Sequence, residues 1–263
     1  MSMNKSGEYR VDLNSDLGES FGAYKIGMDK DVLSFVSSAN IACGFHAGDP
    51  AVMAKTVALA SERGVSMGAH PGYPDLVGFG RRNLNMSEGD LHDCVLYQLG
   101  ALSAFVKASG AKLIHVKPHG AMYNMAAKDI KLARAICRAV SEFDNKLILL
   151  GLANSRFEQA AEDTGIRFAS EVFADRGYMD DGSLVPRTQP GAMITDEDEA
   201  VKRVVKMIKM GTVTSVSGSE IPVRADSVCV HGDGEKALAF TQKIRAELER
   251  EGISIVPLGQ IMN

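Results

Sequence analysis

The sequence lacks the features that mark secreted, membrane-spanning or nucleic-acid-binding proteins. It has only four cysteines in 263 residues, none in a CxxC pair, which argues against a disulfide framework and a structural zinc site. No apolar run approaches the ~20 residues of a membrane span, and the first ten residues contain no apolar signal core. The net charge of −4 is spread without a block of one sign, so neither nucleic acid nor a membrane surface is an expected partner. We expect a cytoplasmic protein.

Several cofactor and nucleophile motifs are also missing. There is no GxxxxGK[ST] phosphate loop, no GxGxxG after a strand and no GxSxG elbow between a strand and a helix. The segment HGDGEKA at 231–237 contains Gly and Lys, but at the wrong spacing for a phosphate loop. These absences argue against ATP handling by a P-loop, a Rossmann cofactor and an elbow-type serine hydrolase.

Strands and helices alternate along the whole chain. Strands are predicted at 9–13, up to about 46, and at 65–70, 113–119, 146–153, 167–175, 227–233 and 253–257. Helices are predicted at 28–37, 50–63, 87–109, up to 143, and at 155–163, 195–210 and 233–250, with a small hairpin at TVTSV and IPVRA. This order without a linker predicts one α/β domain over 1–263, a (β/α) barrel. A doubly wound open sheet is the alternative, which periodicity does not exclude.

Polar residues gather on one face of the predicted strands, toward their C-terminal ends. Side chains alternate between the faces of a strand, so Asp12, Asn14 and Asp16 share a face, and Asn40 shares one with His46. Cys43 falls on the opposite face, which argues against a nucleophilic role beside His46. In a barrel the polar faces converge on one cavity. The side chains expected there are Asp12, Asp16, His46, His70, His115, Lys117, His119, Asp175 and His231.

Carboxylates, imidazoles and a lysine at strand ends suit general acid–base hydrolysis, with or without a divalent metal. An Asp with two His is a plausible ligand set, but the helical HExxH motif is absent and no metal ligand is assigned. The loop at 176–195 is about twenty residues long, and loops of that length are usually functional or disordered.

The motifs at these strand ends resemble those of the LamB/YcsF family, over about residues 9–257. They are DLNSDLGE (12–19), NIACGFHAGDP (40–50), AHPGYPDLVGFGRR (69–82), VKPHGAMYN (116–124), EVFADRGYMDDGSLVPR (171–187) and VHGD (230–233). One conservative departure is Met122, where a Leu is expected.

The resemblance implies a distorted, seven-stranded (β/α) barrel similar to the glycoside hydrolase and deacetylase fold. It also implies that the chain is the A subunit of an ATP-dependent 5-oxoprolinase. This enzyme has separate B and C subunits and hydrolyses 5-oxo-L-proline to L-glutamate. Since the chain has no P-loop, we expect ATP to be bound mainly by the partner subunits. A homo-oligomer is compatible with the sequence.

Roles for the cavity residues follow as hypotheses from this resemblance. Asp16 or Asp175 is the expected general base, while Lys117 and one of His46, His70 and His119 are expected to stabilise the oxyanion and the leaving phosphate. The expected substrate-binding residues are Asp12, Asn14, Asn40, Arg81, Arg176 and His231, with Arg82 and Arg187 as further candidates for the substrate carboxylate. Two rival functions stay open: a metal-dependent deacetylase or amidohydrolase acting alone, and a non-catalytic scaffold subunit.

Overall fold

Strand β1 (Tyr9–Leu17) is nine residues long and pairs with β2 along its second half and with β9 through its middle, which closes the sheet into a ring. The structure is a computed structural model that describes residues 8–230 and 235–262. The other strands of the ring are β2 (Ser38–Ala42), β3 (Ser66–His70), β4 (Leu113–Val116), β5 (Ile148–Leu152), β6 (Arg167–Phe173) and β9 (Ser227–Cys229). All seven run parallel, in the order β1-β2-β3-β4-β5-β6-β9 and back to β1.

This ring confirms the predicted seven-stranded barrel and excludes the open doubly wound sheet. Strand β10 (Ile253–Ile255) pairs only with the first residues of β1 and lies outside the ring. Strands β7 (Thr212–Thr214) and β8 (Glu220–Pro222) form the predicted antiparallel hairpin as a separate two-stranded sheet. Strand β5 is buried along its whole length, as its almost wholly apolar sequence requires of a strand covered on both faces.

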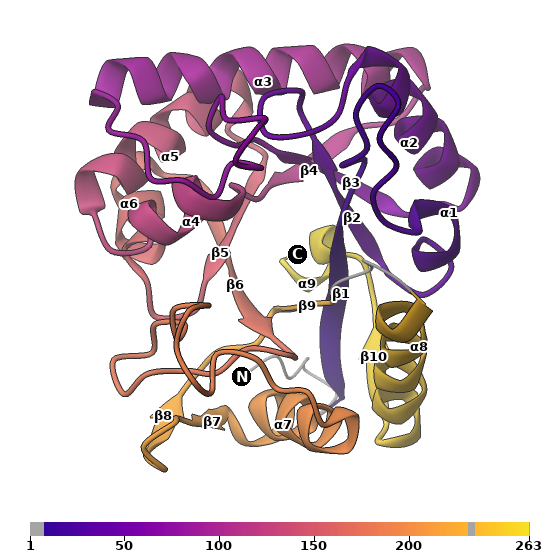
Figure 1. Cartoon of the computed structure of the whole chain (residues 1–263), viewed down its shortest axis with the longest axis vertical. Helices are drawn as coiled ribbons and strands as arrows, with labels where there is room; N and C mark the ends of the chain where they lie inside the picture. The colour runs from indigo at the N-terminus through magenta and orange to yellow at the C-terminus, as the bar shows by residue number, and fades with distance from the viewer. Residues whose placement is uncertain (1–7, 231–234, 263) are drawn as a thin grey trace.

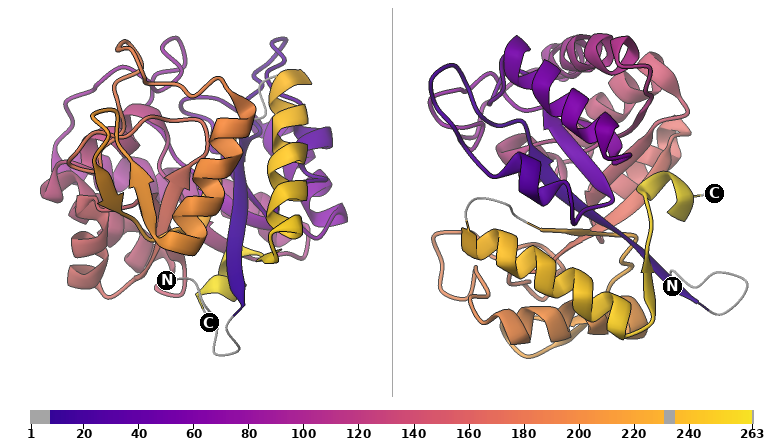
Figure 2. Two further views of the ribbon diagram at one scale, coloured as in Figure 1. Left: turned by 90° about the horizontal axis from the view of Figure 1, so that it is seen from below. Right: turned by 90° about the vertical axis from the view of Figure 1, so that its right-hand side faces the viewer.

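Helices surround the ring on the outside (Figure 1). They are α1 (Asp29–Val32), α2 (Pro50–Glu62), α3 (Glu88–Ala108), α4 (Gly120–Ala126), α5 (Ile130–Asp144), α6 (Arg156–Thr164), α7 (Glu197–Met210), α8 (Glu235–Arg250) and α9 (Leu258–Ile261). Helices α3, α5 and α6 pack in sequence along one side, and α7 packs beside α8 on another (Figure 2). Within the described residues, no helix combines the length and apolarity needed to cross a membrane.

Helix boundaries follow capping residues that the sequence displays. The Asp49 carboxylate accepts from the amide of Val52 and begins α2, and the Ser87 hydroxyl accepts from the amide of Asp90 and begins α3. The first strand is longer than predicted, since it continues past Leu13 to Leu17, and the first helix is shorter, spanning only Asp29–Val32.

The short helix α9 covers the N-terminal end of the barrel. Leu258 is fully buried against Ile148, Leu150 and Ala169, and its amide donates to the Ser38 hydroxyl at 3.4 Å. With this end covered, the opposite end of the barrel, where the parallel strands terminate, remains for a binding site.

Candidate active site

A pocket of about 870 Å³ opens at the C-terminal ends of the barrel strands. Its floor and wall carry Asp16, Glu19, His70, Lys117 and His119. Much of the remaining lining comes from α4 and the residues after it, from the segment between β5 and α6, and from the 176–195 loop, and the loop after β3 adds Arg81 and Asn83. Basic side chains dominate the charged lining: Arg81, Lys117, Lys128, Arg156, Arg176 and Arg187.

Lys117 is the central cation of the pocket floor. It follows β4 directly, and its buried ammonium lies 2.9 Å from Asp16 Oδ1 and 2.9 Å from Glu171 Oε1. It also lies 3.3 Å from Asn14 Oδ1 and 3.2 Å from Cys229 Sγ. Burial opposes the charged form, but the two carboxylates outweigh it and raise the pKa of Lys117 well above its ordinary value. The ammonium is therefore a permanent positive charge and no proton acceptor at neutral pH.

The groups around Lys117 have fixed charge states. Burial raises the pKa of Asp16, but the charges of His70 and Lys117 outweigh it, and the net pKa lies well below the ordinary value. Burial and the nearby Glu171 raise the pKa of Tyr123 well above its ordinary value, so its phenol stays neutral and donates to Glu171 Oε2 at 2.7 Å. The floor therefore presents an ionised carboxylate beside an ammonium.

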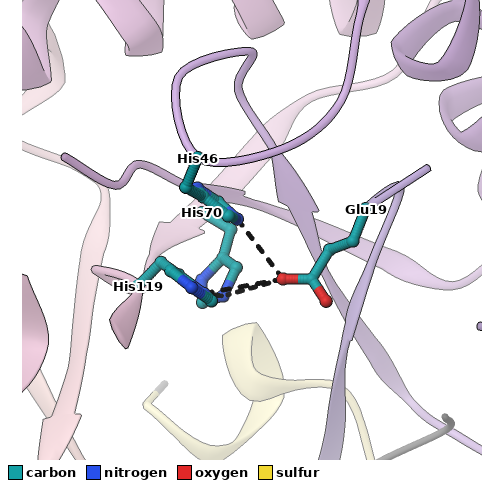
Figure 3. Close-up of side chains that lie close together, drawn as sticks. All are labelled: Glu19, His46, His70 and His119. Carbon is teal, nitrogen blue, oxygen red and sulfur yellow. Dashed lines mark hydrogen bonds and ion pairs between the residues drawn. The ribbon is translucent and has the colours of Figure 1, made fainter. Parts of the chain in front are cut away.

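Three histidines and Glu19 converge at one wall of the pocket (Figure 3). His70 Nε2 lies 3.0 Å from His119 Nδ1 and 3.3 Å from Asp16 Oδ2. Glu19 Oε1 lies 3.3 Å from His46 Nε2 and 3.5 Å from His119 Nδ1. Burial and the neighbouring His70 lower the pKa of His119 to about 3, and burial with both neighbouring rings lowers that of His46. His46 and His119 are therefore neutral at pH 7.

Glycines make room for these rings. Gly80 has φ +62°, and a Cβ on it would lie 2.7 Å from the His46 Cβ and 2.9 Å from the His119 ring. A Cβ on Gly72 would lie 2.5 Å from His46 Nδ1. The glycine-rich loop after β3 thus allows His46 and His119 to stack with ring centroids 3.7 Å apart.

Three of the predicted substrate-binding residues lie below the pocket, in the barrel interior. Asp12 is fully buried and accepts from Ser37, Ser38 and Ser227. Asn14 and Asn40 are hydrogen-bonded to each other at 2.7 Å, and neither is among the described residues lining the pocket. Strand parity was right to turn all three inward. Asp12 and Asn14 lie deep because a β1 of nine residues spans more than one layer of the interior, and the role of all three residues in binding substrate stays a prediction.

The general-base role of Asp175 stays a prediction, although Asp175 is not among the described pocket-lining residues. The acid of β6 that pairs with Lys117 is Glu171. Strand β6 ends at Phe173, so the alternation that turns Glu171 inward does not extend to Asp175. His231 lies outside the described residues.

The arginine candidates separate into lining and structural residues. Arg81 and Arg187 line the pocket, whereas Arg82 forms an ion pair with Asp75. Arg176 lines the pocket but donates from Nε to the carbonyl of Ala192 at 3.1 Å and from an Nη to that of Val185 at 2.7 Å. Arg176 thus holds the 176–195 loop in place, and only its remaining donors face a ligand.

Sequence reasoning missed Glu19, Glu171 and Tyr123. Glu19 follows β1 by two residues, beyond Gly18, where strand parity no longer applies. Glu171 was on the predicted polar face of its strand, and that parity was the available signal. Tyr123 gave no signal, because its contact with Glu171 joins α4 to β6 across the pocket.

Comparisons with known proteins agree with one another. The sequence matches the LamB/YcsF family model over residues 11–263. The A subunit of 5-oxoprolinase from Clostridium beijerinckii is 60% identical over 96% of this chain and 99% of its own length. The corresponding A subunit from Bacillus subtilis is 59% identical over 96% of this chain and 98% of its own length.

Solved structures give the same result at the level of the fold. The lactam utilization protein from Thermus thermophilus superposes with a TM-score of 0.89 at 46% identity, covering 94% of this chain and 99% of that one. A structure described as T48 deacetylase with substrate superposes with a TM-score of 0.52 at 13% identity, covering 98% and 92%. The second likeness concerns the fold alone.

Proposed function

Since this chain belongs to the LamB/YcsF family, we propose that it is the subunit of an ATP-dependent 5-oxoprolinase that hydrolyses the activated lactam to L-glutamate, working with separate B and C subunits. The observation that carries the proposal is the ion-paired Lys117, held between Asp16 and Glu171 at the floor of a pocket with a basic lining. The choice of substrate in this proposal follows from the names of the relatives. The proposed hydrolytic role of this chain follows from the charged residues of the pocket.

The charge of the pocket suits an anionic substrate. 5-Oxo-L-proline carries one carboxylate, and an activated form bearing a phosphate would carry more negative charge. Arg81 and Arg187 at the pocket wall are placed to hold such groups through charge-assisted hydrogen bonds. Lys117 is placed to stabilise negative charge that develops on the oxygen of the reacting carbonyl.

The chemistry explains why ATP and partner subunits are needed. A five-membered lactam is a resonance-stabilised amide and a poor electrophile. Transfer of the ATP γ-phosphate to the amide oxygen, on a partner subunit, would make the ring carbon attackable. Water then adds to that carbon, the C–N bond breaks as the nitrogen takes a proton, and a second water releases phosphate, giving L-glutamate. Asp16, ionised and in the pocket, is the group that accepts the proton of the attacking water.

Reconstitution tests this division of labour. The chain would be incubated with 5-oxo-L-proline and ATP, alone and with the B and C subunits, and glutamate measured. We expect glutamate only from the full mixture with ATP. Glutamate from this chain alone, or ATP-independent release of acetate from an acetylated sugar, would overturn the proposal in favour of an enzyme acting by itself.

A further inference from the structure

We propose that Glu19, His70 and His119 form a binding site for a transition-metal dication of the Zn²⁺ type at the wall of the pocket. The inference is drawn from the geometry of these three side chains and does not rest on the lactam chemistry proposed above. All three side chains line the pocket, so a bound cation would be reachable by a ligand there.

The hydrogen bonds of the two rings direct their lone pairs at each other. His70 Nδ1 is 2.7 Å from the carbonyl oxygen of Lys117, and His119 Nε2 is 2.9 Å from that of Phe79. A carbonyl only accepts, so both of these nitrogens carry the hydrogen. This leaves His70 Nε2 and His119 Nδ1, which lie 3.0 Å apart, as the ring nitrogens that can offer lone pairs to a cation. Metal-binding histidines are typically oriented by a partner on the other ring nitrogen in this way.

The distances fit one cation. His70 Nε2, His119 Nδ1 and Glu19 Oε1 are separated by 3.0, 3.5 and 4.0 Å. The point equidistant from these three atoms lies about 2.1 Å from each, the length of a zinc bond to nitrogen or oxygen. Asp16 Oδ2 lies 3.3 Å from His70 Nε2, and Asp16 also lines the pocket.

His46 is assigned a positioning role and not a ligand role. Its ring is stacked on that of His119 with an interplanar angle of 3°. A cation in the plane of one of two parallel rings lies outside the plane of the other, so only one of them presents an in-plane lone pair. His119 lines the pocket and is oriented by Phe79, whereas His46 is fully buried behind it.

Charge and ligand type indicate the class of metal. Asp16 and Glu171 flank the ammonium of Lys117, and Glu19 adds a third carboxyl group beside the two rings, so acidic groups lie next to the proposed cation. Two imidazoles with one carboxylate suit Zn²⁺ and its neighbours, whereas Mg²⁺ and Ca²⁺ prefer oxygen ligands throughout. Bound there, the cation would supply a Lewis acid facing the pocket.

Metal binding is tested on the chelator-stripped full chain, with Zn²⁺ titrated against a chromophoric competitor. We expect one Zn²⁺ per chain, no competition from Mg²⁺, and an affinity loss of at least about 100-fold in His70→Asn, His119→Asn and Glu19→Gln. His46→Asn should lose affinity by only about 10- to 100-fold, as expected for a residue that orients a ligand. His92→Asn is the matched control, because His92 contacts Asp93 and Glu142 on the surface and is able to bind stray zinc.

Two results would overturn the site: no Zn²⁺ binding by the wild-type chain, or binding that only His92→Asn removes. Either result would mean that Glu19, His70 and His119 are held together by hydrogen bonds and not by a metal ion. Should the pocket variants fail to fold, the visible absorption spectrum of Co²⁺ added to the wild-type chain tests the site. We expect the bands of a four- or five-coordinate ion with nitrogen ligands. The spectrum of the aqua ion would contradict the site. The measurement uses no turnover, so it is independent of the glutamate assay.

Discussion

At the scale of single residues, the site is a set of buried charges that satisfy one another. Glu171 accepts from Lys117, from Asn14 at 3.1 Å and from the Tyr123 phenol at 2.7 Å, with no exposure to solvent. A buried charge is tolerated only when paired and hydrogen-bonded in this way. Each partner of Glu171 therefore contributes to the stability of the fold as well as to the electrostatics of the pocket.

Replacing Tyr123 by Phe should reduce the free energy of unfolding by about 1–3 kcal/mol, because it leaves one oxygen of a buried carboxylate without a donor. Urea unfolding of both proteins measures the difference. Tyr97→Phe is the control, since that phenol is 65% exposed on α3 and its loss should change stability by less than about 0.5 kcal/mol. Equal effects of the two substitutions would contradict the role given to Tyr123.

Asp12 should make the stability of the chain depend on pH. Burial, opposed by hydrogen bonds from three serines, raises the pKa of Asp12 from 3.8 to about 6. Its contribution to stability is therefore fully present below the unfolded value and is lost as the pH rises through about 6, at a cost of about 3 kcal/mol by pH 7. The unfolding free energy of the wild type relative to Asp12→Asn should fall by about 2.4 kcal/mol between pH 4 and 7, measured in urea, because part of the loss has already occurred at pH 4. A difference that does not change with pH would contradict this account.

Strand alternation predicted several inward residues but did not assign Glu19 or Glu171 to the site. It correctly turned Asp16 on β1, and Lys117 directly after β4, into the barrel. It gave no information on Glu19, which follows a glycine at φ +72°, and it does not extend to Asp175, which follows the end of β6. The pairing of Lys117 with Glu171 depends on the ring closing, which only the tertiary structure provides.

At the scale of elements, the two ends of the barrel have different tasks. Apolar residues and α9 cover the N-terminal end, and loops carry the site at the other end. The helical periodicity and the caps at Asp49 and Ser87 were readable from the sequence, because they are local. The covering of the barrel by a helix of four residues was not, since it depends on Leu258 reaching β5 and β6.

Replacing Leu258 by Ala should lower the free energy of unfolding by about 2–5 kcal/mol, the range for a large-to-small change in a packed core. Glutamate release by the assembled complex at a temperature well below the midpoint should change little, because the site lies at the opposite end of the barrel. Thermal or urea unfolding of the wild type and the variant measures the change in the free energy of unfolding. A large loss of turnover in a folded variant would contradict the separation of the two ends.

At the scale of the whole molecule, the chain places an acid-flanked ammonium, a histidine wall and a basic lining in one pocket. The sequence shows no phosphate loop, which is why the proposed activity assigns activation of the lactam to partner subunits. A scaffold subunit would not need such a pocket, since buried charges that bind nothing cost stability. The claim that this chain performs the hydrolytic step is thus the central one.

The most direct test replaces Lys117 by Ala in the complex assembled with the B and C subunits, and measures glutamate release from 5-oxo-L-proline and ATP. Removing one oxyanion-stabilising group costs about 100- to 1000-fold, so we predict a loss of at least about 100-fold in a variant that still assembles with its partners. Asp16→Asn should reduce glutamate release by a comparable factor. It replaces Lys117→Ala in this test if that variant does not fold. Glutamate release at the wild-type rate by both assembled variants would contradict the account and leave this chain as a scaffold.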